Sequence, residues 1–117
     1  MILHITTRAT WEQARAIGEY RAPSLETEGF IHCSMEAQAL AVANAFYRGQ
    51  RNLVLLVIDE TGLKAPVKWE APAGPAAEGI SAADSFPHIY GPINFAAVSS
   101  VLDFEPDSDG RWTSLPL

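Results

Sequence analysis

Six consecutive apolar residues, Leu53–Ile58, constrain the fold of this chain more than any other segment. Side chains of a β-strand alternate between its two faces, so a strand of this composition is apolar on both faces and needs cover on both. The run is far too short to span a bilayer as a helix, which takes about 20 residues. It therefore predicts the central strand of a sheet, with other elements packed on either side.

The chain has 117 residues, of which 48% are hydrophobic and 19% charged. This is the composition of one ordinary globular domain, expected over residues 1–117. The net charge is −6 and the basic residues are scattered, which argues against a nucleic-acid polymer as partner but leaves a single phosphate open. The start has no signal-peptide pattern, and the single cysteine suits a reducing compartment, so we expect a cytoplasmic protein that does not bind membranes.

Further strands are expected on either side of the central one. Leu3–Thr6 and Val67–Glu70 alternate apolar and polar residues, as half-buried strands do. Phe30–Ser34, Phe86–Tyr90 and Val101–Phe104 predict three more short strands. Strands interleaved with helical segments indicate an α+β fold.

The first of two main helices is expected from Trp11 to about Ile17. Thr10 and Gln13 have the spacing of a capping box, and Gly18 supplies a stop.

The second helix is expected from Met35 to about Arg48, with Ser34 placed as its N-cap. Its predicted buried stripe is Ala39, Val42, Ala43 and Phe46. Proline and glycine interrupt residues 21–29, which are expected to form a loop, and residues 71–85 are expected to form a mobile surface loop. Residues 94–98 are expected to make one helical turn.

All three histidines, His4, His32 and His88, lie on expected strands. Each is followed two positions later by a hydroxyl residue that shares its strand face: Thr6, Ser34 and Tyr90. If the three strands are neighbours, imidazoles and hydroxyls converge on one polar pocket. Such groups donate and accept hydrogen bonds, and histidine titrates near neutral pH, so we predict a shared site for a polar ligand.

Each histidine also has a structural explanation. His4 stands near the terminus and is equally well explained as a residue that holds a neighbouring loop. His32 precedes an expected helix N-terminus, where backbone donors favour an anion. His88 stands before a stiff Tyr-Gly-Pro turn that can aim its ring, or that is simply tight.

Other candidates lie near these histidines. Glu70 is the best-placed carboxylate for a general base or a ribose contact, Trp69 is available to stack on a flat ring, and Arg21 to bind a phosphate. Each is also explained as an ordinary surface residue. Cys33 is expected to be a small core residue rather than a nucleophile. The histidine spacings match no compact metal motif, so no metal is expected.

Four segments carry a resemblance to a known family: His4–Thr6, Ser24–Ser34, Ala43–Tyr47 and Phe86–Pro92. Together they make nearly the whole chain resemble the bacterial domain-of-unknown-function family 952. That family looks like a compact version of the ADP-ribosyltransferase fold. The resemblance implies a split, mixed sheet with about two main helices, and NAD bound in the cleft between the sheet halves.

The resemblance also implies roles for individual residues. His4 and Thr6 are similar to a first-strand motif that contacts the adenosine ribose. Phe30–Ser34 resembles a region that holds phosphate in the RNA 2′-phosphotransferase branch. His88 stands roughly where many members of the superfamily place a glutamate.

Two classes of function are therefore open. The first is a transferase of ADP-ribosyltransferase or phosphotransferase type that binds NAD or a related nucleotide. In it, His32, His88 and Glu70 would move protons, and the ligand would be held by His4, Thr6, Ser34, Trp69, Tyr90 and Arg21. The second is a non-catalytic small-ligand or protein-binding module with structural histidines. A homodimer is compatible with both.

Overall fold

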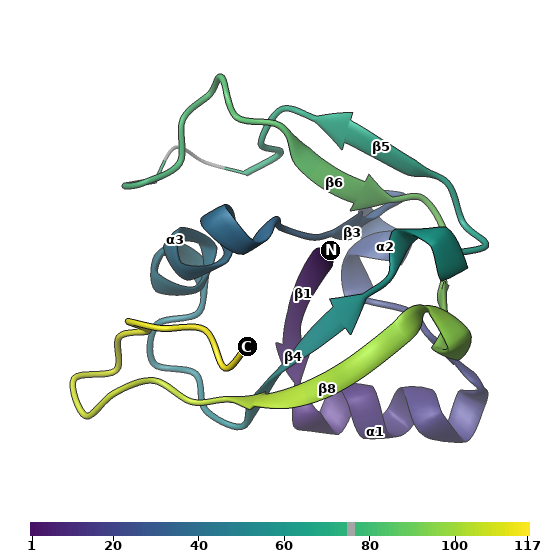
Figure 1. The fold of residues 1–117 in the computed structure, drawn as a ribbon, viewed down its shortest axis with the longest axis horizontal. Helices are drawn as coiled ribbons and strands as arrows, with labels where there is room; N and C mark the ends of the chain where they lie inside the picture. Colours follow the sequence, from purple (N-terminus) through teal and green to yellow (C-terminus); the bar gives the residue numbers. More distant parts are fainter. Residues whose placement is uncertain (75–76) are drawn as a thin grey trace.

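In the computed structural model, which describes residues 1–74 and 77–117, strand β4 (Leu53–Ile58) is central, as its apolar run predicts (Figure 1). It pairs antiparallel with β1 (Ile2–Thr7) on one side and with β8 (Val98–Phe104) on the other. Every residue of β4 is buried. Burial of this apolar strand on both faces stabilises the fold through the hydrophobic effect.

Two smaller antiparallel sheets surround the central one. In the first, β6 (Phe86–Ile89) lies between β3 (Ile31–His32) and β5 (Val67–Glu70). The second pairs β2 (Glu19–Tyr20) with β7 (Ile93–Asn94). In the described residues, the strands thus form three separate sheets. Together with the helices they confirm the α+β fold class.

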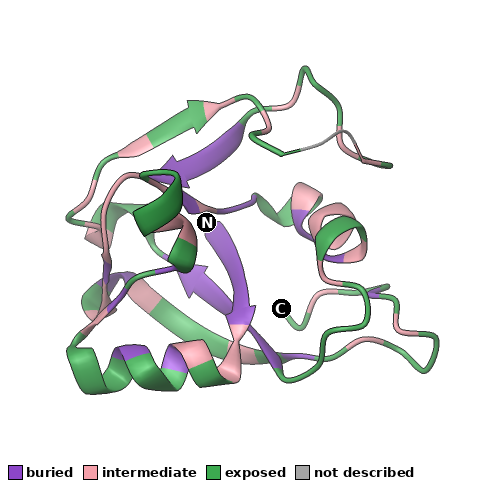
Figure 2. Cartoon of the chain, turned by 180° about the vertical axis from the view of Figure 1, so that it is seen from behind, coloured by how far each residue is buried: buried purple, intermediate pink, exposed green. Residues whose placement is uncertain are grey.

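Three helices pack around these strands: α1 (Arg8–Ile17), the short α2 (Pro23–Thr27) and α3 (Glu36–Phe46). Two single 3₁₀ turns, Glu60–Gly62 and Phe95–Ala97, complete the elements, and the second confirms the predicted helical turn. Figure 2 shows β4 and β6 buried, while β5, β8 and the outer faces of the helices are largely exposed.

The core has two parts, one on each face of the central sheet. One part contains Trp11 of α1, Tyr20 and Leu56. The other contains Ala39 of α3 and the C-terminal Trp112. Alternation along β1 and β4 sends successive side chains to opposite parts, so both faces are covered.

The expected start of the first helix is wrong by three residues. The helix begins at Arg8 rather than Trp11, and Thr7 is its N-cap. The Thr7 hydroxyl accepts a hydrogen bond from the Thr10 backbone N–H at 3.0 Å, so Thr10 lies inside the helix instead of capping it. The predicted end is confirmed, because Gly18 adopts a left-handed conformation with φ of 100°.

Ser34 is not the cap of α3, contrary to expectation. Its backbone N–H and C=O both bond to Leu3 of β1, at 2.8 Å each, which holds Ser34 in an extended bridge. The N-cap is Met35, whose N–H donates to the side chain of Gln38 at 2.9 Å. Phe46, expected in the buried stripe, is 42% exposed at the end of the helix.

Two expected loops have different outcomes. The segment 21–29 contains α2, because the fixed φ of Pro23 suits the first turn of a helix. The segment 71–85 does connect β5 to β6, but its residues 75–76 lie outside the described residues, and its mobility stays a prediction. No helix in the described parts of the chain is long and apolar enough to cross a membrane.

We expect Leu56→Ala to lower the free energy of unfolding by about 2–5 kcal/mol, because Leu56 is fully buried and the variant leaves a cavity. Leu117→Ala is the matched control, since Leu117 is 52% exposed, and its effect should stay within about 0.5 kcal/mol. Urea unfolding followed by circular dichroism measures both. Equal effects of the two substitutions would contradict the central position of β4.

Candidate functional site

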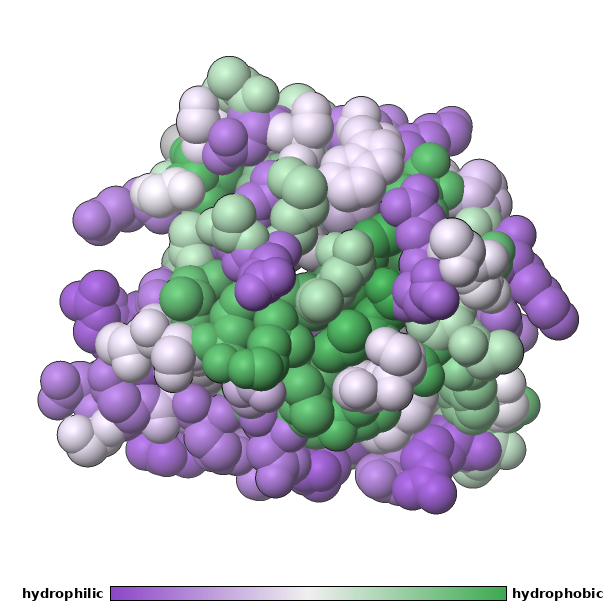
Figure 3. All heavy atoms as spheres, in the orientation of Figure 1, coloured by the Kyte–Doolittle hydropathy of each residue, from purple (hydrophilic) through white to green (hydrophobic). Residues whose placement is uncertain are grey.

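A cavity of about 450 Å³ lies between β1, α3 and the β3–β6 strand pair. This volume is typical of small-molecule sites. Its apolar walls come from β1, α3, the start of β6 and the segment between β5 and β6: Leu3, Ile5, Val42, Phe46, Phe86, Pro72, Ala73, Gly74 and Ile80. Its polar lining residues are Glu28, His32, Cys33, Ser34, Tyr47 and His88. Figure 3 shows apolar side chains gathered near the two chain termini, and a notch in the surface between α3 and the segment after β5.

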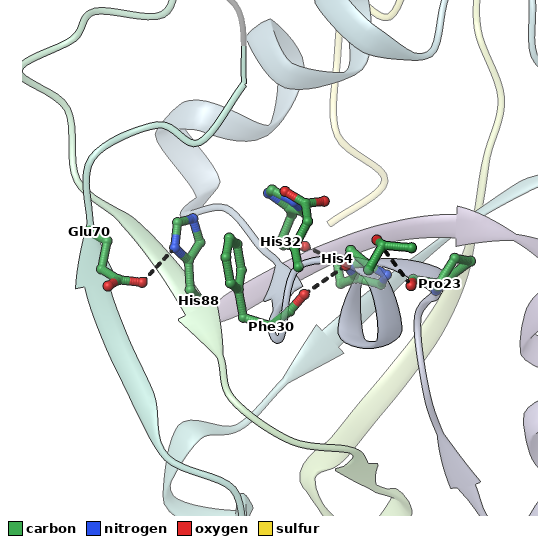
Figure 4. Close-up of polar contacts among 9 residues, drawn as sticks. His4, Pro23, Phe30, His32, Glu70 and His88 are labelled. Carbon is green, nitrogen blue, oxygen red and sulfur yellow. Dashed lines mark hydrogen bonds and ion pairs between the residues drawn. The ribbon is translucent and has the colours of Figure 1, made fainter.

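His32 and His88 face each other across two neighbouring strands. They are direct partners in the β3–β6 ladder, and their ring centroids are 5.6 Å apart. Direct partners in an antiparallel pair share one face of the sheet, which is why both rings reach the same cavity. Phe30 stacks on the His88 ring at a centroid distance of 4.3 Å and restricts its orientation (Figure 4).

His88 is oriented by a carboxylate on the adjacent strand. Its Nδ1 lies 2.9 Å from Oε1 of Glu70, and the Tyr90 hydroxyl donates to the same oxygen at 2.5 Å. The hydrogen bond from Tyr90, followed by that from His88, lowers the pKa of Glu70, so this carboxylate is ionised at neutral pH. An ionised carboxylate can only accept, and Nδ1 of neutral His88 therefore carries the proton.

The other ring nitrogen of His88, Nε2, opens on the cavity. The His88 side chain is only 3% exposed. Among the described residues, every fully buried side-chain nitrogen or oxygen has a hydrogen-bond partner. Nε2 has no partner in the described parts of the protein. It must therefore touch accessible space, and the cavity is the space that His88 lines. In this tautomer Nε2 is a hydrogen-bond acceptor.

His32 has a carboxylate partner of its own in a more open position. Its Nε2 lies 3.0 Å from Oε2 of Glu28, just past the end of α2, and both side chains are 42% exposed. A pair this exposed contributes at most about 1 kcal/mol to stability. Breaking the His32–Glu28 contact therefore has a small energetic cost. Cys33 beside it is buried, and burial raises the pKa of its thiol well above the ordinary value, which makes it a poor nucleophile as expected.

His4 does not share this cavity, which corrects the expectation of one pocket for three histidines. Its Nδ1 donates to the backbone oxygen of His32 at 2.6 Å, and its Nε2 accepts from the Tyr20 hydroxyl at 2.7 Å. The opposite face of β1, with Leu3 and Ile5, lines the cavity instead. His4 thus joins β1 to β2 and β3 from within the core. Burial lowers its pKa to about 4.

Four other predicted ligand contacts lie outside the described lining, and one of them, Tyr90, donates to Glu70 instead. Thr6 is buried on the His4 face of β1. Arg21 is exposed and pairs with two surface glutamates. Trp69 is 46% exposed on the face of β5 opposite to Glu70. Their contacts with a ligand stay predictions without support from the cavity geometry.

Sequence reasoning missed Phe30 and Glu28. Phe30 stands two residues before His32, so strand alternation already places both on one face. Glu28 precedes the strand in a segment expected to be a loop, and no local pattern points to its contact with His32. No cluster of metal-ligating side chains occurs in residues 1–74 and 77–117.

We expect the buried His4 to make stability depend on pH. Its folded pKa of about 4 lies below the ordinary value of 6.5, so the unfolded chain binds a proton first as the pH falls. The free energy of unfolding should therefore drop between pH 6.5 and 4, by on the order of 3 kcal/mol from this group. His4→Gln cannot titrate. A stability difference between wild type and His4→Gln that stays constant over this window would contradict the prediction.

We expect the neutral imidazole of His88 to carry its proton on Nδ1 in wild type, because the ionised Glu70 accepts that hydrogen. In Glu70→Gln the amide can donate to Nδ1, so the population with the proton on Nε2 should rise. Long-range ¹H–¹⁵N NMR of the ring nitrogens measures this. Lys68→Gln is a control on the same strand that should keep the wild-type tautomer, and an Nε2-protonated wild-type ring would contradict the assignment.

The comparisons with known proteins agree with the architecture. The crystal structure of protein CC0527 from Caulobacter crescentus is 36% identical, with a TM-score of 0.80 over 94% of this chain and 90% of that one. The crystal structure of a double mutant of CC0527 (35% identity, TM-score 0.79, 94% and 90% coverage) is similar too. So is the solution NMR structure (35% identity, TM-score 0.70, 94% and 89% coverage).

No match is found among curated proteins. The family model described as "Protein of unknown function (DUF952)" matches residues 5–101. The chain therefore belongs to the DUF952 family.

Proposed function

We propose that this protein binds a small organic molecule in the cavity between β1, α3 and β6, and that His88 exchanges a proton with it. The observation that carries the proposal is the His88–Glu70 pair: one ring nitrogen is held by an ionised carboxylate, and the other opens on a cavity of ligand size. His4, by contrast, satisfies both ring nitrogens within the protein.

The pair has the parts of a general base. Glu70 holds the tautomer and favours the imidazolium that forms when Nε2 takes a proton from the ligand. The stacked Phe30 and the Tyr90 hydroxyl limit movement of the ring and the carboxylate. The same nitrogen can then return the proton as a general acid. Catalysis of this kind contributes about 10²–10⁴ in rate.

His32 is the second proton-transfer group in the proposal. It faces the same cavity and is held only by its half-exposed contact with Glu28. Ser34, also in the lining, supplies a hydroxyl that can donate to or accept from a ligand.

NAD and related nucleotides, an ADP-ribosyltransferase-like architecture and transferase activity remain proposals that rest on the resemblance described above. The negative charge of a phosphate would need a positively charged partner in this cavity. Among the described residues, the lining has no lysine or arginine. Protonated His32 is the group available for that role.

The alternative, a binding module without catalysis, is favoured by one observation. His4 uses both nitrogens to join three strands, so at least one of the histidines has a role in the fold. In this module the same cavity holds a ligand, but His88 contributes only a hydrogen bond.

The test is ligand-observed NMR with a panel of NAD, ADP-ribose, cyclic phosphates and uncharged aromatic fragments. We expect members of the panel to bind wild type but not Val42→Trp, because the indole fills the cavity wall on α3. Val101→Trp on β8 is the matched control, since Val101 is 37% exposed and lies outside the described lining, and it should bind as wild type does. His88→Gln should bind more weakly.

Thermal unfolding checks that each variant is folded. Binding that is equal in Val42→Trp and wild type would overturn the proposed cavity. Binding that is lost in Val42→Trp but unchanged in His88→Gln would favour a module in which His88 takes no part.

A further inference from the structure

We infer that the ligand of this cavity is an amphiphile with an apolar body and a head group that donates hydrogen bonds and carries no negative charge, such as an amine or an alcohol. The inference rests on the proposed cavity and chooses between the ligand classes left open there: it favours an uncharged or cationic head group over NAD and the related nucleotides that the resemblance implies. It follows from how apolar walls, acceptors and carboxylates are distributed around the cavity.

The apolar body is indicated by the walls from β1 and α3. Leu3 and Ile5 form one side, and Val42 and Phe46 form the other. Phe46 is 42% exposed although it is a large apolar side chain next to the cavity, so a ligand body can cover it. Burial of apolar surface against these walls supplies affinity without orientation.

The donor head is indicated by the acceptors at the β3–β6 side. Nε2 of His88 accepts when Nδ1 donates to Glu70, and the carboxylate of Glu28 lies at the same cavity. An O–H or N–H head can donate to both kinds of group. An ionised carboxylate or phosphate head group has no hydrogen to donate, so Nε2 of His88 would accept no hydrogen bond from it.

Charge points the same way. Glu28 is the carboxylate among the described lining residues, and the ionised Glu70 stands directly behind His88. Lys68 lies outside the described lining, with its ammonium over the Tyr90 ring, 4.6 Å from the centroid, where its charge favours the ionised form of Glu70. An anion in this partly apolar space is desolvated next to like charges, which is unfavourable.

The test uses three probes with one body, a phenyl ring on a four-carbon chain: 4-phenylbutylamine, 4-phenylbutanol and 4-phenylbutyrate. Calorimetric titration at pH 8 measures the affinity of each probe. We expect the amine to bind wild type about tenfold more tightly than the carboxylate, with the alcohol between them.

Two isosteric variants locate the charge responsible. Glu28→Gln removes the lining carboxylate and should reduce the preference for the amine over the carboxylate by about threefold or more. Glu26→Gln is the matched control on α2: Glu26 pairs with Arg21 at the surface, and its loss should leave the preference as in wild type.

The outcomes separate this inference from the proposed function. A carboxylate that binds wild type as tightly as the amine overturns the ligand class and leaves the cavity in place. An equal loss of preference in Glu28→Gln and Glu26→Gln also overturns it, since net charge alone would then be responsible. Probes that bind equally well to wild type and Val42→Trp, or that do not bind at all, overturn the proposed cavity.

Discussion

The need to cover both faces of β4 underlies the rest of this structure. Its six apolar residues have to be buried on both sides, so the protein builds two cores that share one thin sheet. The neighbouring strand β1 is therefore also covered on both faces. One of its faces carries His4 into the first core, and the other presents Leu3 and Ile5 to the cavity. The position of the cavity follows from this two-sided arrangement.

The three histidines show how far environment separates identical side chains. His4 is enclosed, and its two hydrogen bonds tie together strands that have few hydrogen bonds of their own, since β2 and β3 are two residues long. His88 is also enclosed but retains one nitrogen for the cavity. His32 is half-exposed beside a carboxylate. The first arrangement joins strands within the core, and the other two place imidazole rings at the cavity.

Local sequence signals predicted elements better than their ends. Gly18 stops α1 as expected, because a glycine accommodates the left-handed conformation that ends a helix. Thr10 and Ser34 were wrong as caps for different reasons. Thr7 precedes Thr10 with an equally good hydroxyl, and Ser34 is held by backbone pairing with a residue 31 positions earlier. Sequence patterns carry no information about that second kind of contact.

The sequence by itself determined the central strand, the α+β class and the strands on which the three histidines lie, because each depends on apolar runs and on strand alternation within a few residues. Only the tertiary structure decided that His4 is enclosed, that Glu70 and Glu28 each meet a histidine, and that Phe30 stacks on His88. These contacts depend on which strands are neighbours and which face of each is covered. Both are settled by the packing of the whole chain around β4, not by any local segment.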